Sequence, residues 1–76
     1  MIHVRLYAGI RSRSHPDQNE LHVAAQPGLT VADVIRKTGV PADDVRIVIV
    51  NGQSAANDEP LTDGDRVALF PVVAGG

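Results

Sequence analysis

The sequence predicts an α+β domain in which one short helix packs on a small sheet. Three observations predict this class. Residues 2–8 alternate between apolar and other side chains, residues 31–38 lie between helix start and stop signals, and residues 45–50 are almost entirely β-branched. A single short helix covers one face of such a sheet, so the other face meets water or a partner.

The size and composition limit the possible functions. The chain has 76 residues, no cysteine and a formal net charge of −2 at pH 7. This length has room for one core only, and without cysteine there is no disulfide, thiolate nucleophile or cysteine-based zinc site. Tyr7 and Phe70 are the only aromatic residues, too few for a nucleic-acid stacking platform. We therefore expect no nucleic-acid partner.

The hydropathy pattern gives an expectation about location. No window approaches the ~20 apolar residues that a membrane-spanning helix needs. The first residues also lack the charged and then apolar pattern of a signal peptide. We expect a cytoplasmic protein without a membrane partner.

The first two strands are predicted to form a hairpin. Alternation in residues 2–8 places four apolar side chains on the buried side: Ile2, Val4, Leu6 and Ala8. Residues 20–25 form the second strand, with Leu21 and Val23 facing inward. The polar residues 9–19 are the long connection between them.

The helix has the clearest local signals in the chain. Thr30 suits the N-cap, and Asp33 three residues later completes a variant of the capping box. Gly39 suits the left-handed residue that ends a helix, and Pro41 prevents its continuation. The predicted helix therefore covers residues 31–38. Its apolar stripe consists of Val31, Val34 and Ile35.

Two further strands are predicted in the second half. Residues 45–50 suit a strand with neighbours on both sides, and Asn51-Gly52 then forms a tight turn. Residues 53–61 are irregular, and residues 66–70 form the last strand. Its two faces carry Val67 and Leu69 on one side, and Ala68 and Phe70 on the other.

The order of elements and the ending of the chain resemble a known family. Residues 61–76 read Leu-Thr-Asp-Gly-Asp-Arg-Val-Ala-Leu-Phe-Pro-Val-Val-Ala-Gly-Gly. They are similar to the sulfur-carrier proteins, including the molybdopterin synthase small subunit (MoaD) and the thiamine sulfur carrier (ThiS). The resemblance covers essentially the whole chain. It implies a ubiquitin-like β-grasp domain over 1–70, with a mixed four- to five-stranded sheet and one helix on one face, and a flexible tail over 71–76.

Different segments resemble different subfamilies. Phe70-Pro71 and the long loop over 9–19 look more like the molybdopterin synthase subunit. The short helix over 31–38 and the strand and turn over 48–52 look more like the thiamine carrier. The resemblance favours molybdenum or tungsten pterin synthesis, with thiamine thiazole synthesis second and cysteine synthesis or tRNA thiolation third.

The resemblance also implies how the tail acts. An E1-like adenylyltransferase would activate the Gly76 carboxylate with ATP, and a persulfide donor would supply sulfur for a C-terminal thiocarboxylate. The acceptor would be a synthase, such as a molybdopterin synthase large subunit or a thiazole synthase. Gly75 and Gly76 lack Cβ and fit a narrow tunnel, into which Val73 and Ala74 would follow. The chain itself would bind no cofactor and would not be an enzyme.

A docking patch is predicted where the tail begins. Phe70 is expected on the face away from the helix, beside Ala68 and Tyr7, with Pro71 next to it. The alternative is that Phe70 tucks under residues 53–61 as part of the core. Four arginines are candidates for charge complementarity with a partner: Arg5, Arg11, Arg13 and Arg66.

Three other functions remain open from the sequence. The same activated carboxylate serves a ubiquitin-like modifier conjugated through Gly76 to target lysines. A second alternative is an interaction domain with an inert tail. A metal site is the third, because His3 and His22 are predicted cross-strand neighbours. It lacks a third ligand, since His15 lies in a loop, and we expect no metal.

Overall fold

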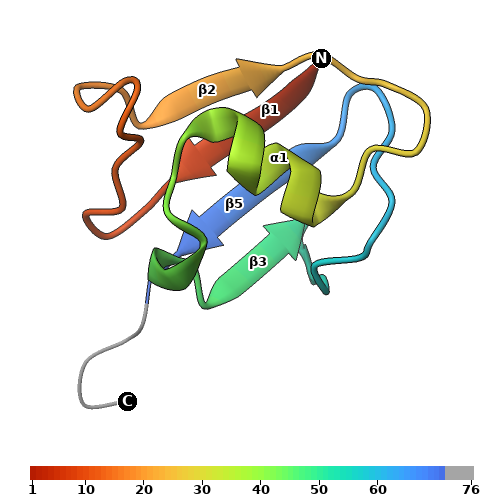
Figure 1. Cartoon of the computed structure of the whole chain (residues 1–76). Helices are drawn as coiled ribbons and strands as arrows, with labels where there is room; N and C mark the ends of the chain where they lie inside the picture. Colours follow the sequence, from red (N-terminus) through yellow and green to blue (C-terminus); the bar gives the residue numbers. More distant parts are fainter. Residues whose placement is uncertain (72–76) are drawn as a thin grey trace.

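The structure, a computed structural model, describes residues 1–71 (Figure 1). The predicted tail over 71–76 lies outside the described residues apart from Pro71. The elements follow in the order β1 (Ile2–Leu6), β2 (Glu20–Val23), α1 (Val31–Thr38), the 3-10 helix η1 (Ala42–Asp44), β3 (Ile47–Val50), β4 (Gln53–Ser54) and β5 (Arg66–Phe70).

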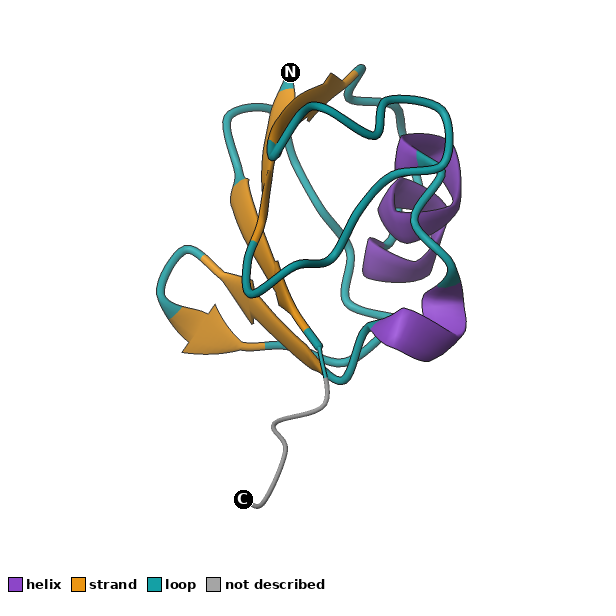
Figure 2. Ribbon diagram, turned by 90° about the vertical axis from the view of Figure 1, so that its left-hand side faces the viewer, coloured by secondary structure: helices purple, strands orange, loops and turns teal. Residues whose placement is uncertain are grey.

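The strands form one mixed sheet in the order β2-β1-β5-β3-β4. β1 and β5 pair in parallel, and the other neighbouring strands pair antiparallel. The helix α1 lies on one face of this sheet, as the view along the sheet edge shows (Figure 2). The predicted α+β class is therefore confirmed, as is the prediction that residues 45–50 contain a strand with two neighbours.

The core lies between the sheet and α1. β1 contributes Ile2, Val4 and Leu6, which are all buried as the alternation predicted. Ala8 does not join them: it is exposed and has a φ of 55°. The chain turns away from the sheet after β1, where the Ile10 amide donates to the Tyr7 carbonyl at 3.2 Å. The prediction that Ala8 faces the core is therefore wrong, because the strand ends two residues earlier.

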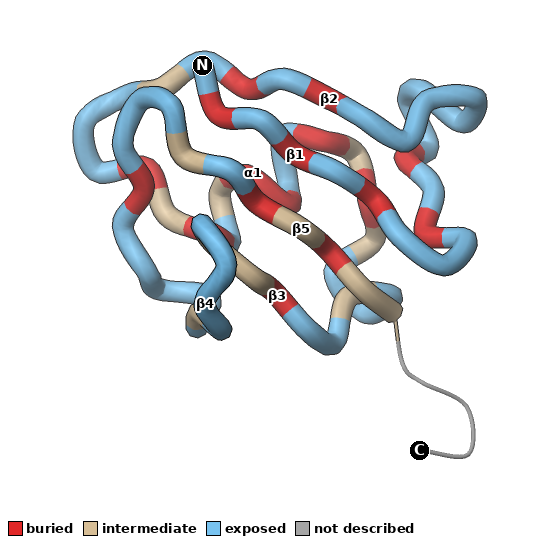
Figure 3. Tube along the Cα trace, turned by 180° about the vertical axis from the view of Figure 1, so that it is seen from behind, coloured by how far each residue is buried: buried red, intermediate tan, exposed pale blue. Residues whose placement is uncertain are grey.

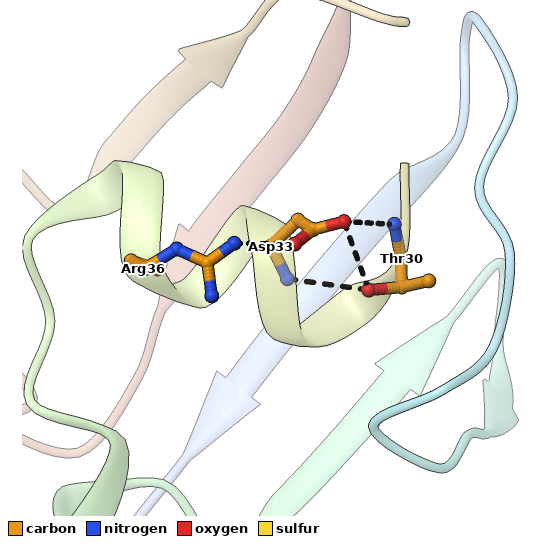
Figure 4. Close-up of polar contacts among 3 residues, drawn as sticks. All are labelled: Thr30, Asp33 and Arg36. Atoms are coloured by element: carbon orange, nitrogen blue, oxygen red, sulfur yellow. Dashed lines mark hydrogen bonds and ion pairs between the residues drawn. The ribbon is translucent and has the colours of Figure 1, made fainter. Parts of the chain in front are cut away.

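The helix has the predicted bounds and the predicted caps. Figure 4 shows the cap at its N-terminus. The Thr30 amide donates to Asp33 Oδ2 at 3.0 Å, and the Asp33 amide donates to Thr30 Oγ1 at 3.4 Å. Arg36 adds an ion pair with Asp33 Oδ1 at 2.5 Å. The hydrogen bond from the Thr30 amide, followed by the bond from Arg36, holds the pKa of Asp33 below its usual value. Gly39 ends the helix with a φ of 79°.

Two more strand boundaries and one additional strand differ from the sequence prediction. β2 ends at Val23 rather than at residue 25, and β3 begins at Ile47 rather than at residue 45. The late start of β3 follows from η1, since the Val45 amide donates to the Ala42 carbonyl instead of joining the sheet. The segment predicted as irregular contains the two-residue strand β4.

The connection between β1 and β2 is anchored to the helix in a way that its polar sequence did not indicate. Ser12 is fully buried, and its Oγ donates to the Thr38 carbonyl at the end of α1. The Arg13 amide donates to the Gly39 carbonyl at 3.0 Å. Ile10 is also buried in the core. Hydrogen bonds and burial therefore hold the first part of this loop against the end of α1.

Within residues 1–71, no helix has both the length and the apolar character needed to cross a membrane.

Candidate docking site

The sheet face opposite α1, here called the outer face, is covered by no helix of residues 1–71 (Figures 2 and 3). Strand alternation and register place nine side chains of β1, β2, β3 and β5 on it: His3, Arg5, Glu20, His22, Ile47, Ile49, Arg66, Ala68 and Phe70. The central strand β5 lies between β1 and β3, so its outward residues occupy the middle of this face. A partner that approaches the outer face therefore meets the residues of β5 between those of β1 and β3.

Tyr7 and Phe70 form an aromatic stack at the end of β5. Their ring centroids are 4.6 Å apart and their planes differ by 9°. The parallel register pairs Leu6 with Leu69, and the Tyr7 amide donates to the Leu69 carbonyl at 3.0 Å. This backbone contact brings the two rings together although they are far apart in the sequence. The predicted neighbourhood of Phe70 and Tyr7 is confirmed.

Phe70 is half-buried and does not belong to the buried core. The alternative in which it tucks under residues 53–61 is therefore wrong. Ile47 lies directly opposite Phe70 in β3 and is 42% exposed. The sequence analysis did not single out Ile47. The available signal was its position next to Val48, which is buried. Successive residues of a strand face opposite sides of the sheet, so Ile47 faces outward.

The other two predicted docking residues also lie near this end of the sheet. Ala68 is half-buried on the outer face, between Arg5 of β1 and Ile49 of β3. Pro71 follows Phe70 and lines a small concavity of about 260 Å³ with Ile10. The predicted threading and attachment residues lie outside the described residues: Val73, Ala74, Gly75 and Gly76.

The arginines predicted to complement a partner separate into two groups. Arg5 and Arg66 lie on the outer face. Arg11 donates to the Ile10 carbonyl at 3.2 Å, and Arg13 lines a concavity next to α1. The structure therefore does not bring all four guanidinium groups to one surface.

Arg5 is engaged by a cross-strand carboxylate. Its Nη2 lies 3.1 Å from Glu20 Oε2, between exposed side chains of β1 and β2. The hydrogen bond and the charge of Arg5 lower the pKa of Glu20. The hydrogen bond to Glu20, followed by one to Tyr7, raises the pKa of Arg5. Exposed pairs of this kind add little to stability, so their main effect here is to orient Arg5.

The two histidines of the hairpin are cross-strand neighbours, as predicted. His3 pairs with His22, and their rings meet edge to face with centroids 4.8 Å apart. Among residues 1–71, no three His, Cys, Asp or Glu side chains form a group that could hold a metal ion. Within residues 1–71, a cation bound between His3 and His22 would therefore have two imidazole ligands and no third side-chain ligand.

A mixed sheet with one helix on one face, and with its C-terminal strand in the centre, defines a ubiquitin-like β-grasp protein. Here the last strand ends beside the Tyr7–Phe70 stack, in which Tyr7 is exposed and Phe70 is half-buried. The chain belongs to the ThiS family, whose sequence model matches residues 4–76.

Solved structures of other proteins share this fold over nearly the whole chain. SAMP1 from Haloferax volcanii is 25% identical, with a TM-score of 0.71, and the match covers 99% of this chain and 98% of that one. A putative molybdopterin converting factor subunit 1 from Pyrococcus furiosus is 27% identical, with a TM-score of 0.69 and coverage of 95% and 97%.

A third solved structure is similar to this chain in fold, at a lower sequence identity. In the complex of subunits 1 and 2 of the molybdopterin-converting factor from Helicobacter pylori, the matching chain is 19% identical, with a TM-score of 0.60 and coverage of 99% and 97%. Together with the family match, these likenesses define the chain as a ThiS/MoaD-like sulfur carrier or a ubiquitin-like small modifier.

Proposed function

We propose that this chain is a sulfur carrier that works through the carboxylate of Gly76. An E1-like enzyme joins that carboxylate to the AMP part of ATP and releases pyrophosphate. A persulfide sulfur then displaces AMP, and a thiol cleaves the resulting acyl disulfide to leave a thiocarboxylate. The thiocarboxylate donates its sulfur to a cofactor precursor held by an acceptor synthase. These steps take place in the cytoplasm.

One observation carries the proposal. The ThiS family match extends over residues 4–76 and therefore includes the terminal pair Gly75-Gly76. The described body is consistent with a carrier role, because the last strand ends beside an exposed apolar patch rather than in a catalytic cleft. The partner enzymes supply the catalytic groups, and this chain supplies recognition and the reacting carboxylate.

Molybdenum or tungsten pterin synthesis is the favoured destination of the sulfur, and thiamine thiazole synthesis is second. The likeness to a putative molybdopterin converting factor subunit 1 supports the first. In the Helicobacter pylori structure the related chain is bound to subunit 2, which supports a synthase large subunit as the acceptor. We assign docking on that partner to Tyr7, Ala68, Phe70 and Pro71, while residues 73–76 enter its active site.

A second candidate function is conjugation to other proteins. It is favoured by the likeness to SAMP1, since a structure of the same fold is described as small archaeal modifier protein 1. In this case the adenylated Gly76 carboxylate forms isopeptide bonds with target lysines. Lys37 is the only lysine of the chain, so it is the only internal side chain on which polymers of this protein can grow.

The intact mass of protein purified gently from its own cells tests both candidates. A fraction with sulfur in place of one oxygen at Gly76, absent from a variant without Gly76, supports the carrier. Gly76 found only in isopeptide bonds supports the modifier instead. A carboxylate that stays bare, even with ATP and the adenylating enzyme of the same cells, contradicts both and leaves an interaction domain.

A further inference from the structure

The turn between β3 and β4 carries a chemically reactive pair of residues. Asn51 is the only asparagine of the chain that is followed by glycine. Both residues of the turn are exposed and have a positive φ, 51° at Asn51 and 85° at Gly52, as a two-residue hairpin turn requires. Because glycine lacks Cβ, its amide nitrogen meets little steric hindrance. Asn51-Gly52 is therefore the pair of this chain most prone to deamidation.

Deamidation converts an asparagine into an acid without a second protein. The Gly52 nitrogen gives up its proton and bonds to Asn51 Cγ, while the Cγ–Nδ2 bond breaks and the amide leaves as ammonia with that proton. The resulting succinimide takes up one water molecule. Opening at Cγ gives aspartate, whereas opening at the main-chain carbonyl gives isoaspartate. The reaction therefore consumes only water and releases only ammonia.

The folded protein holds the Asn51 carboxamide away from this reaction. Its Nδ2 donates to Asp65 Oδ1 at 3.0 Å, and its Oδ1 accepts from the Arg66 amide at 3.0 Å. The Asn51 amide also donates to the Arg66 carbonyl at 2.9 Å. The carboxamide has to give up both of its own hydrogen bonds before Cγ can turn towards the Gly52 nitrogen. The reaction therefore needs a local opening between this turn and the start of β5.

Asp65 is itself fixed as the acceptor of the Asn51 side chain. The Thr62 amide donates to Asp65 Oδ2 at 2.8 Å. This bond, followed by the one from the Asn51 side chain, lowers the pKa of Asp65, so its carboxylate is ionised at neutral pH. A hydrogen bond to an ionised acceptor is stronger than one between neutral groups. Asp65 thus restrains Asn51 from a position that the preceding turn sets.

We propose that Asn51 is a latent deamidation site and that Asp65 protects it by holding its carboxamide at the start of β5. Deamidation would place a carboxylate oxygen where Nδ2 now lies 3.0 Å from Asp65 Oδ1, and two carboxylates this close repel each other. An isoaspartate would also add a methylene group to the main chain of the turn that sets the register of β3 and β4. The modified chain therefore loses the contact between this turn and β5, whichever function the protein has.

The test follows deamidation of the full chain by peptide mass mapping at neutral pH and constant temperature. The readout is the rate at which the peptide with Asn51 becomes an acid and its isoaspartate form appears. Asp65→Ala removes the acceptor, and Asp65→Asn keeps an acceptor oxygen without the charge. Ser12→Ala is the matched control, because it removes a buried hydrogen bond at the end of α1 instead. The unmodified protein in guanidinium chloride gives the rate of the unfolded chain, and denaturation measures the stability of each variant.

We expect Asn51 to deamidate at least about tenfold more slowly in the folded protein than in guanidinium chloride, because the folded reaction waits for an opening. Asp65→Ala should raise the folded rate about tenfold, the factor that corresponds to loss of one hydrogen bond to a charged group. Asp65→Asn should raise it about threefold, since a neutral acceptor holds the amide less firmly. Ser12→Ala should stay within about twofold of the unmodified protein, because it leaves the turn intact.

Two results would overturn the inference. Equal rates in the folded protein and in guanidinium chloride would show that the turn gives Asn51 no protection. A folded Asp65→Ala variant whose rate rises no more than that of an equally destabilised Ser12→Ala would show that Asp65 acts only through overall stability. If Asp65→Ala proves unfolded, a folded Asp65→Asn variant that deamidates at the unmodified rate overturns the inference in its place.

Discussion

Tyr7 and Phe70 stack almost parallel on the outer face, with ring planes 9° apart and centroids separated by 4.6 Å. The two residues come from opposite ends of the chain and meet because β1 and β5 pair in parallel at the centre of the sheet. The only tyrosine and the only phenylalanine of the protein thus form one surface at the point where the last strand ends.

The stack predicts a measurable coupling between the two rings. Tyr7→Ala and Phe70→Ala each lower the free energy of unfolding, and the double variant loses less than the sum of the two. We expect a coupling energy of about 0.5–1.5 kcal/mol, the usual range for aromatic pairs. Chemical denaturation of the four proteins measures it. A strictly additive double variant contradicts a stabilising stack.

Replacing Gly39 with alanine is expected to destabilise the protein through two effects. The φ of 79° is unfavourable for a residue with a Cβ, and that Cβ would lie 2.8 Å from Ser14 Oγ and 3.0 Å from Ser12 Oγ. The Ser12 oxygen is held by hydrogen bonds and cannot easily move.

Gly28 provides the matched control, since its φ is 77° and nothing lies within 4 Å of an added Cβ. Gly39→Ala should therefore lower the free energy of unfolding by about 1 kcal/mol more than Gly28→Ala. Equal losses in urea denaturation would show that the contact with the serines carries no cost.

Ser12→Ala tests the attachment of the loop to the helix. The buried Ser12 Oγ donates to the Thr38 carbonyl and accepts from the amides of Ser14 and His15. Removing it leaves these groups without that partner, which costs about 1–3 kcal/mol of unfolding free energy. Ser14→Ala, at an exposed position, should change stability by less than about 0.5 kcal/mol. The opposite ranking in denaturant melts would contradict the anchoring role of Ser12.

The helix cap predicts a pH dependence of stability. The pKa of Asp33 is lowered in the folded protein, first by the Thr30 amide and then by Arg36, so near its ordinary value of 3.8 the unfolded state binds more protons. The cap therefore stabilises the fold fully above that value, and its contribution disappears as the pH falls through the lower folded-state pKa.

Unfolding free energies measured from neutral to strongly acidic pH check this prediction. Asp33→Asn should be less stable than the unmodified protein at neutral pH, and the difference should shrink in acid. Asp17→Asn, which changes an exposed carboxyl in the loop, is the control. A difference between the Asp33→Asn and unmodified proteins that stays constant over the whole pH range would show that ionised Asp33 is not what stabilises the cap.

The sequence by itself determined the elements whose causes are local. The helix over 31–38 has its predicted bounds, because Thr30, Asp33 and Gly39 act on groups within one turn of themselves. The inward residues of β1 were also predictable, since alternation along a strand needs no knowledge of its neighbours. The resemblance in residues 61–76 pointed to the family that the match over 4–76 then showed.

Only the tertiary structure decided the features that depend on pairing between distant segments. The parallel register of β1 and β5 brings Tyr7 to Phe70 and places Arg5 beside Ala68. The burial of Ser12 follows from its contact with the end of α1, 26 residues further along the chain. Such contacts join residues whose separation along the chain carries no periodic signal, so the propensities of the separate segments do not determine them.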